Sequence, residues 1–361
     1  MEVEFDPELS SELSRCLGCG GCNIPCPLFN AEDRLESSGM RSRMKILYML
    51  SRGSIELTES TLRHIFTCAN CGLCDRYCPV DIRPFDLLVR TRGSFIDMGY
   101  VPLVTVGMRD SFRRSGSPIG GDLIKGNWLP PDFQPKRGSS VLLFAGCWMH
   151  KATEIALNTM RILGKVSEDF TTIGPDEPCS GALLYILGER DLASESRERL
   201  MSMISELSPK EVISGCSLTP RVYAELNFTA LTSFILRSVR SGDLKLSRYK
   251  GKELRVLPLP SCSSESSLKV LLTSIEGIGV IEPPEWLCCD CGFTLLYREE
   301  GERFSNWVQR VLSLASAHAA THVVIEDVGC YAMFTDILET KVRSKGIKAS
   351  HISSFMLEFI K

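Results

Sequence analysis

The sequence lacks a strong excess of charge of either sign. It contains 41 lysines and arginines against 44 aspartates and glutamates, a formal net charge of -3, and its basic residues are scattered along the chain. Sequence-independent binding to nucleic acid depends on concentrated positive charge, which this chain does not have. We therefore expect no nucleic-acid partner.

The sequence also lacks the segments that carry a protein to or across a membrane. The opening residues, MEVEFDPELSSELS, are acidic and polar, whereas a secretory signal begins basic and continues apolar. Residues 311–325 form the longest stretch without Lys, Arg, Asp or Glu, and they are too few to span a bilayer. These absences predict a cytoplasmic protein with no membrane span of its own, in which any membrane association comes through a partner subunit.

Nucleotide-binding and nucleophile motifs are missing as well. There is no Gly-rich phosphate loop, no dinucleotide fingerprint and no nucleophile elbow, which leaves no recognisable site for NAD or flavin. Histidine is scarce, with five in the chain. We interpret His150 as a surface residue near the start of a helix, with a fourth ligand for a site at Cys147 as the alternative.

Cysteine, in contrast, is abundant. The 16 cysteines fall into two equal blocks, one within residues 16–78 and one within residues 147–330. In a chain without an export signal disulfides are disfavoured, so metal binding or redox chemistry is the leading explanation for so much thiol.

The first block contains the same motif twice. CLGCGGCNIPCP and CANCGLCDRYCP both have the spacing C-x2-C-x2-C-x3-C-P, which is typical of ferredoxins with four-iron clusters. In such two-cluster proteins the fourth cysteine binds the cluster of the other motif. We therefore predict two 4Fe-4S clusters with crossed ligands: Cys16, Cys19, Cys22 and Cys78 for cluster one, and Cys68, Cys71, Cys74 and Cys26 for cluster two.

A pair of zinc sites is the alternative for this block, because C-x2-C also suits tetrahedral zinc. Zinc does not require a third and a fourth cysteine at this spacing followed by proline. Two clusters with crossed ligands lie close together, so we interpret this part of the chain as a relay for single electrons.

Local patterns divide the chain into four expected segments. Residues 40–53 and 58–66 have helical periodicity, and no alternating strand pattern occurs in the first block, so the first segment is expected to be mainly helical. Between the two cysteine blocks, glycines and prolines interrupt any helical or strand periodicity, which is typical of a linker. The expected organisation is a helical ferredoxin-like domain in residues 1–120, a linker in 121–138, a first α/β repeat in 139–250 and a second α/β repeat in 251–361.

The second block predicts an α/β fold made of two tandem repeats. Cys147, Cys179 and Cys216 recur in the same order, at nearly equal displacement, as Cys262, Cys288 and Cys330. Short apolar runs suited to buried strands alternate with helical stretches, as in parallel α/β units. These runs lie in residues 139–148, 169–174, 211–216, 254–262 and 321–330. Most of them end in a cysteine, at the carboxyl ends of strands where open α/β sheets form ligand sites.

Two ferredoxin-type motifs followed by two such repeats resemble the cysteine-rich (CCG) iron-sulfur oxidoreductases. That family includes the catalytic subunit of heterodisulfide reductase, the C subunit of anaerobic glycerol-3-phosphate dehydrogenase, and iron-sulfur subunits of glycolate and lactate oxidases. The resemblance covers nearly the whole chain and includes the segment SGMRSRMKILYML between the two motifs. We interpret Arg41 and Arg43 in that segment as a solvated basic face.

The resemblance implies a cysteine site in each repeat, and this sequence departs from the family pattern in both. In the heterodisulfide reductase branch, each complete motif supplies five cysteines to a non-cubane four-iron cluster that cleaves a disulfide. The first repeat retains Cys147, Cys179 and Cys216, while Ser180 and Thr219 fill the other two positions. We predict that these three cysteines pack in the interior or form a vestigial site, with a cluster as the alternative.

The second repeat retains four of the five cysteines: Cys262, Cys288, Cys289 and Cys330. Asp290 takes the glycine position and Met333 the last cysteine position. We predict a metal centre or a redox thiol site here, which would be a third iron-sulfur cluster or a zinc site, with Cys291 as a replacement ligand. A disulfide between the adjacent Cys288 and Cys289 is the redox alternative.

Together these features predict an iron-sulfur electron-transfer subunit of a cytoplasmic oxidoreductase complex. It would relay single electrons through two 4Fe-4S clusters to or from a partner flavoprotein dehydrogenase or another redox subunit. Two alternatives stay open. One is a disulfide reductase of the heterodisulfide type with a catalytic iron-sulfur centre in the second repeat, and the other is a scaffold subunit whose cysteine-rich half binds zinc or no metal.

Overall fold

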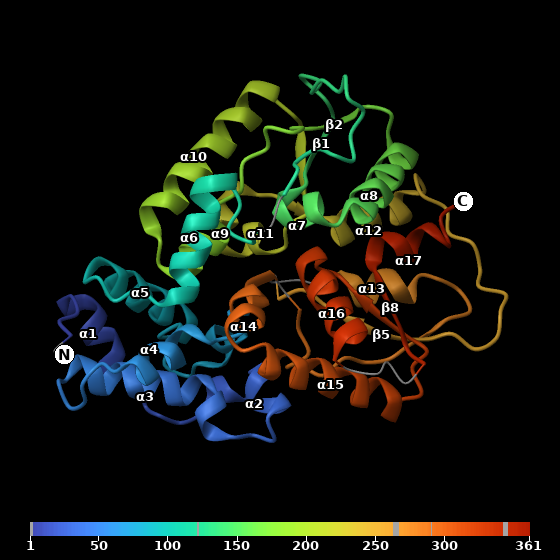
Figure 1. The fold of residues 1–361 in the computed structure, drawn as a ribbon. Helices are drawn as coiled ribbons and strands as arrows, with labels where there is room; N and C mark the ends of the chain where they lie inside the picture. The colour runs from blue at the N-terminus through green and yellow to red at the C-terminus, as the bar shows by residue number, and fades with distance from the viewer. Residues whose placement is uncertain (1–2, 121–122, 263–266, 290, 342–345) are drawn as a thin grey trace.

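Three parts of the chain meet at the centre of the molecule. Figure 1 shows the helical N-terminal part at the lower left, a first α/β unit at the top and a second α/β unit at the lower right. The computed structural model describes residues 3–361 except 121–122, 263–266, 290 and 342–345, and the side chain of Cys291 is likewise outside the described set.

The N-terminal part is helical, as predicted. Its α-helices are α1 (Pro7–Ser14), α2 (Pro27–Ala31), α3 (Met40–Ser51), α4 (Glu59–Phe66), α5 (Pro84–Asp97) and α6 (Leu103–Ser115). Short 3-10 helices accompany them: η1 (Gly21–Asn23), η2 (Glu36–Ser38) and η3 (Leu73–Tyr77). The first and third of these lie inside the two cysteine motifs and face each other.

Local sequence explains the two helices between the motifs. Helix α3 buries Met44 and Leu47 on one face, whereas Tyr48 is exposed. Helix α4 begins with a capping box, in which Thr58 and Thr61 satisfy each other's backbone N–H groups. The carboxyl end of α4 leads directly into the second cysteine motif.

Each α/β unit contains one four-stranded parallel sheet. The first has the order β2-β1-β3-β4 and the second the order β6-β5-β7-β8, so the two sheets have the same topology. Their strands are β1 (Val141–Phe144), β2 (Phe170–Thr172), β3 (Glu211–Ser214), β4 (Thr229–Ala230), β5 (Arg255–Leu259), β6 (Gly279–Val280), β7 (His322–Ile325) and β8 (Lys348–His351). The predicted fold class, a helical domain followed by two tandem α/β repeats, is confirmed.

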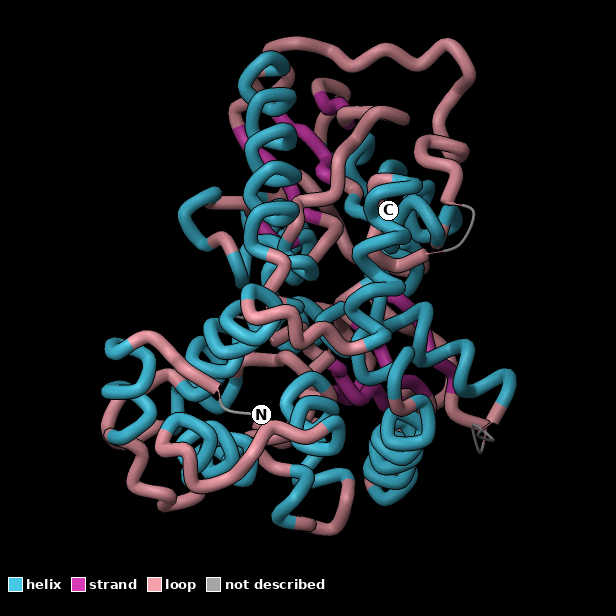
Figure 2. The backbone as a smooth tube through the Cα atoms, turned by 60° about the vertical axis from the view of Figure 1, so that its left-hand side comes forward, coloured by secondary structure: helices cyan, strands magenta, loops and turns pink. Residues whose placement is uncertain are grey.

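Helices cover both sheets (Figure 2). In the first unit they are α7 (Gly146–Lys151), α8 (Thr153–Val166), α9 (Ala182–Leu187), α10 (Arg190–Leu207), α11 (Leu218–Val222), η4 (Ala224–Leu226) and α12 (Leu231–Ser241). In the second they are α13 (Leu268–Thr273), η5 (Cys291–Phe293), α14 (Thr294–Glu299), α15 (Gly301–Ala317), α16 (Val328–Thr340) and α17 (Ile352–Leu357). Within the described residues, every helix is too short or too polar to cross a lipid bilayer.

The carboxyl edges of the two sheets face each other. Ser217, which follows β3, donates a hydrogen bond to Asp327, which follows β7. Thr232 at the start of α12 makes a similar bond to Glu326. Cysteines of both repeats follow strands at these edges.

Glycine permits close contact between the helical part and the first repeat. Gly188 ends α9 with a φ of +92°, and a Cβ atom at this position would lie 2.6 Å from the backbone nitrogen of Gly93 on α5. No side chain fits in that space. The approach brings α5 against α9 and so fixes the helical part on the first repeat.

We expect Gly188→Ala to destabilise the protein more than a matched change without the contact. Gly242 has a similar φ of +88°, and a Cβ atom there would have nothing within 4 Å, so Gly242→Ala measures the cost of the left-handed backbone alone, about 1–2 kcal/mol. Gly188→Ala adds an overpacking penalty on the order of 1–3 kcal/mol. Thermal unfolding should therefore give a lower Tm for Gly188→Ala than for Gly242→Ala, and equal values would contradict the close contact.

Candidate functional site

The first set of predicted ligands lies together at the edge of the helical part. One small cavity is lined by Cys16, Cys19, Cys22 and Cys78, which we call set one. Gly20 turns the chain here with a φ of +86°, and Arg41 packs against it. Burial, followed by the neighbouring thiols, raises the pKa of Cys22 to about 12. Cys19 is exposed and Leu17 beside it is 68% exposed, so set one is open to the surface.

The second set lies deeper. Cys26, Cys68, Cys71 and Cys74, which we call set two, are all buried. Burial raises the pKa of Cys74 well above its usual value, and Asp75 and the other three thiols of the set raise it further, which shows that the four thiols are neighbours. The structure thus places one cysteine of each motif with the other motif's three. The ligand assignments themselves stay predictions.

The spacing of these thiols suits a cluster of several metal ions better than a single ion. Four sulfurs bound to one zinc at about 2.3 Å lie about 3.8 Å from one another. In the described part of the chain, no three thiols from within set one or set two lie within 4.8 Å of one another. The eight thiols and the glycine turns that carry them therefore fit 4Fe-4S clusters.

Asn70, inside the second motif, connects set two to both repeats. Its amide nitrogen donates to the carbonyl of Cys68 at 2.8 Å and to that of Gly292 in the second repeat at 3.0 Å. Its amide oxygen accepts from Arg92 at 2.7 Å, and Arg92 also donates to the carbonyl of Ile186 in the first repeat at 2.9 Å. Set two therefore lies where the three parts of the molecule meet.

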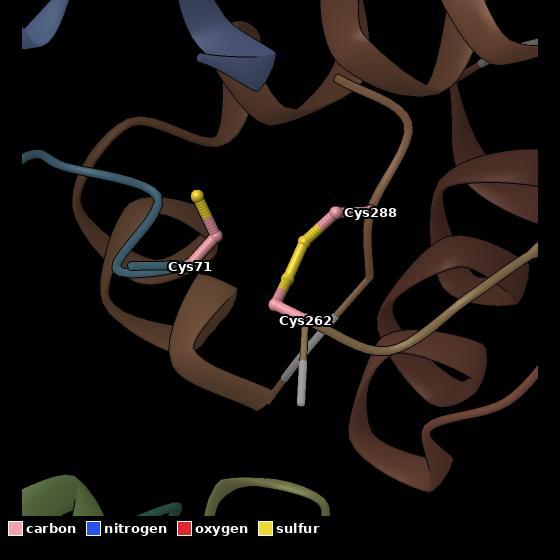
Figure 3. A group of neighbouring side chains, drawn as sticks. All are labelled: Cys71, Cys262 and Cys288. Atoms are coloured by element: carbon pink, nitrogen blue, oxygen red, sulfur yellow. A yellow bond between two sulfur atoms is a disulfide. The ribbon is translucent and has the colours of Figure 1, made fainter. Parts of the chain in front are cut away.

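A disulfide of the second repeat lies beside set two. Cys262 follows β5 and is linked to Cys288, with 5.5 Å between their Cα atoms. The sulfur atoms of Cys71, Cys262 and Cys288 are within 4.8 Å of one another, and Figure 3 shows the three side chains together. Cys289 and Cys330 form a hydrogen bond with each other in the same repeat. The four cysteines predicted for a metal or redox site thus form two pairs, Cys262 with Cys288 and Cys289 with Cys330.

The pairing differs from the disulfide that the sequence suggested. Cys288 is bonded to Cys262, and its neighbour Cys289 is free, so the expected alternative of a Cys288–Cys289 disulfide is wrong. Parallel pairing explains the difference, because the backbone bridge between Ser261 and Cys289 brings the end of β5 alongside the Cys288 segment. The predicted roles of Asp290 and of the Cys291 side chain lie outside the described residues.

A cavity of about 450 Å³ opens at this junction. Its lining includes Cys71 of set two and Cys262 of the disulfide, together with Tyr185 and Arg221 of the first repeat. Asp75 also lines it, and burial raises the pKa of this carboxyl to about 6. A small molecule in the cavity would contact both the cluster-binding loop and the disulfide.

The first repeat holds hydroxyl groups at the positions where the family has cysteines. Thr219 donates to Ser180 at 2.7 Å, and both residues are buried. Two satisfied hydroxyls thus stand in place of two soft ligands. Of the three cysteines expected to pack in the interior, Cys179 is buried, whereas Cys147 and Cys216 are partly buried. Cys147 and Cys179 form a hydrogen bond with each other, and Cys216 lies near Cys179.

His150 is not at the surface, and that prediction is wrong. It is 1% exposed. Its Nδ1 accepts hydrogen bonds from the backbone of Gly126 at 3.1 Å and from the Trp128 indole at 3.2 Å. Its Nε2 therefore carries the proton and donates to Glu177 at 3.3 Å. Trp128 comes from the predicted linker, and local sequence does not show that this segment folds back over the histidine.

Arg43 is not part of a solvated face either. Arg41 is partly exposed, as predicted, and forms an ion pair with Glu36 at 3.5 Å. Arg43, two residues later on the same helix, is completely buried, which contradicts the prediction. Its guanidinium lies against backbone carbonyls at the end of α4, a contact between residues far apart in the sequence.

Two family models match the chain. Residues 12–82 match a 4Fe-4S dicluster domain, and residues 141–218 match a cysteine-rich domain. The second match falls on the first repeat, which retains fewer cysteines than its counterpart. No solved structure matches the chain.

Curated relatives agree with these domains. The chain is 26% identical to the D subunit of the dihydromethanophenazine:CoB-CoM heterodisulfide reductase of Methanosarcina acetivorans, over 57% of this chain and 55% of the relative. It therefore spans little more than half of that protein. It is 22% identical to the probable glycolate oxidase iron-sulfur subunit of Bacillus subtilis, over 99% of this chain and 96% of the relative. An EtfAB:quinone oxidoreductase of Syntrophomonas wolfei is 22% identical over 67% of this chain and 42% of its own length.

The family resemblance that the cysteine motifs carry is confirmed by these matches. The chain is an iron-sulfur protein that combines a 4Fe-4S dicluster domain with a cysteine-rich domain, and it is related to the D subunit of heterodisulfide reductase and to glycolate oxidase iron-sulfur subunits.

Proposed function

We propose that this protein is the electron-transfer subunit of a cytoplasmic oxidoreductase complex and exchanges single electrons with a partner flavoprotein. Set one would hold the first 4Fe-4S cluster and set two the second. One observation carries the proposal: each motif contributes three thiols to one set and its fourth thiol to the other. A 4Fe-4S cluster takes up and releases one electron at a time.

The positions of the two sets support a direction from the surface to the interior. Set one, with exposed Cys19 and Leu17, would face the redox partner. Set two is buried, and the sulfur of its Cys71 lies within 4.8 Å of both sulfurs of the disulfide. The inner cluster would therefore be the one that exchanges electrons with this thiol pair.

Metal and sulfide analysis tests this proposal. Protein purified without oxygen should contain about eight irons and eight acid-labile sulfides per chain, as two cubane clusters require. About twelve irons would add a third cluster in the second repeat. Four or fewer would contradict the two-cluster proposal.

A pair of variants tests the crossed ligands. Cys78→Ser should alter the electron paramagnetic resonance signal of the cluster held by Cys16, Cys19 and Cys22, because the serine replaces its fourth ligand. Cys26→Ser is the matched control and should alter the other cluster. If each variant disturbs only the cluster of its own motif, the crossed assignment is wrong.

We propose reduction of a disulfide substrate as a second candidate function, because the Cys262–Cys288 disulfide lies beside Cys71 and its Cys262 lines the 450 Å³ cavity. Two electrons from the second cluster and two protons would convert the disulfide into two thiols. These thiols would then reduce a disulfide substrate in the cavity to two thiols and return to the Cys262–Cys288 bond. A metal centre held by the same cysteines would require this bond to be reduced first.

Peptide mapping tests the second candidate. Protein alkylated without reductant should contain linked Cys262 and Cys288 peptides, and a brief anaerobic dithionite pulse should release both thiols. Cys74→Ser, which removes a ligand of the second cluster, should keep the disulfide under the same pulse because electrons no longer reach it. Equal release in both proteins, or a Cys288–Cys289 link, would contradict this function.

A further inference from the structure

Two arginines in the helical part are completely buried. Arg43 on α3 and Arg92 on α5 are both 0% exposed. A buried guanidinium is costly unless its donors are bonded and its charge is balanced. Lysine, arginine and acidic residues are almost never fully buried without a partner.

Backbone carbonyls satisfy the hydrogen bonds of Arg43. It donates to the carbonyls of Ser38 at 2.8 Å and Gly39 at 2.9 Å, at the start of its own helix. It also donates to the carbonyls of His64 and Thr67, both at 3.1 Å. Thr67 directly precedes Cys68, the first thiol of the second motif. Arg43 therefore holds the chain where set two begins.

Arg92 approaches the same segment from the other side. It donates to the carbonyl of Ile65 through Nη2 at 2.8 Å and through Nε at 3.2 Å. It also donates to the carbonyl of Phe66 at 3.3 Å and stacks over that ring at 5.1 Å. Its remaining acceptors are the amide oxygen of Asn70 and the carbonyl of Ile186. The donors of Arg92 are thus satisfied without an acidic group.

The charge of these arginines, unlike their hydrogen bonds, is not balanced by a carboxylate. The ion pairs among the described residues include neither Arg43 nor Arg92. Burial lowers the pKa of Arg92 to about 10, which leaves it protonated at neutral pH. Two positive charges therefore remain in the interior.

The thiols of set two are the groups that these charges face. Arg43 donates to the carbonyl of Thr67, the residue before Cys68. Arg92 donates to Asn70, whose backbone N–H in turn donates to the sulfur of Cys68 at 3.4 Å. A cluster held by four thiolates is an anion, and reduction adds one more negative charge to it. Fixed cations in a low-dielectric interior favour that reduced form.

We propose that Arg43 and Arg92 are the counter-charges of the cluster at set two, and that they raise its reduction potential above that of the cluster at set one. This inference rests on the proposed function, since it requires a cluster at each set. Among the described residues set one has no comparable charge, because Arg41 beside it is partly exposed and neutralised by Glu36. Electrons that enter at the surface would therefore collect at the inner cluster, next to the Cys262–Cys288 disulfide.

A purely structural role is the competing explanation. Both arginines bind carbonyls at the carboxyl end of α4, and cations stabilise helices at that end. Such a role affects folding and cluster assembly but predicts no selective change in the potential of one cluster. A lysine at either position keeps the positive charge and loses the forked hydrogen bonds, so it separates the two roles.

Redox titration of the iron-loaded protein, followed by electron paramagnetic resonance, tests the proposal. Cys74→Ser identifies the signal of the inner cluster. In Arg92→Gln we expect the ratio of reduced to oxidised inner cluster at a fixed potential to fall at least tenfold, which is 59 mV for a one-electron couple. The outer cluster should stay unchanged. Arg92→Lys should recover most of the shift, and Arg43→Gln should shift the same signal in the same direction.

Lys45→Gln is the matched control on the same helix as Arg43, because Lys45 is exposed, and it should change neither cluster more than twofold. A threefold or smaller change in Arg92→Gln with full iron content would overturn the proposal, and so would a shift that Arg92→Lys does not recover. If the glutamine variants do not assemble their clusters, the reduction potentials of the unaltered protein still test the inference. An inner cluster with a lower reduction potential than the outer cluster would contradict it. Failure of the proposed function is a different result, namely four or fewer irons per chain.

Discussion

The hydrogen bonds of Asn70 fix the position of the inner thiols of set two, and the rest of the site depends on these bonds. One side chain bonds the second cysteine motif, the second repeat and, through Arg92, the first repeat. A conformation that satisfies all of these bonds exists only when the three parts are docked. The residue itself has a φ of +58°, a conformation that asparagine tolerates better than most residues. Cys71 therefore takes its position beside the disulfide only when the three parts are docked.

The two repeats share a topology and differ in chemistry. Both sheets have the same strand order, and in both a cysteine follows the first and third strands. In the first repeat the missing thiols are replaced by the Ser180–Thr219 pair, which satisfies its own hydrogen bonds. In the second repeat Cys262 and Cys288 are close enough to bond, and Met333 occupies the buried position one turn after Cys330. The repeat that lies beside Cys71 of set two is thus the one that contains the disulfide.

Sequence could predict the elements of this fold because the signals are local. Helices α3 and α4, the five apolar strands and the two cysteine motifs each follow from residues within a short window. The short edge strands β4, β6 and β8 were not predicted, because they contain too few apolar residues to form a pattern. The burial of Arg43 and His150 depends on α4 and Trp128, which are distant along the chain, and the partner of Cys288 depends on strand pairing. No local pattern contains such information.

The proposed relay also resolves a mismatch in electron number. A 4Fe-4S cluster carries one electron, whereas reduction of a disulfide requires two. A single cluster beside Cys262 and Cys288 would have to pass its first electron into a half-reduced disulfide and wait for the second. Two clusters in line can hold both electrons before transfer begins, provided that the inner one keeps its electron while the outer one is refilled. The buried positive charge of Arg43 and Arg92 around set two supplies that condition, because it favours the reduced inner cluster over the reduced outer one.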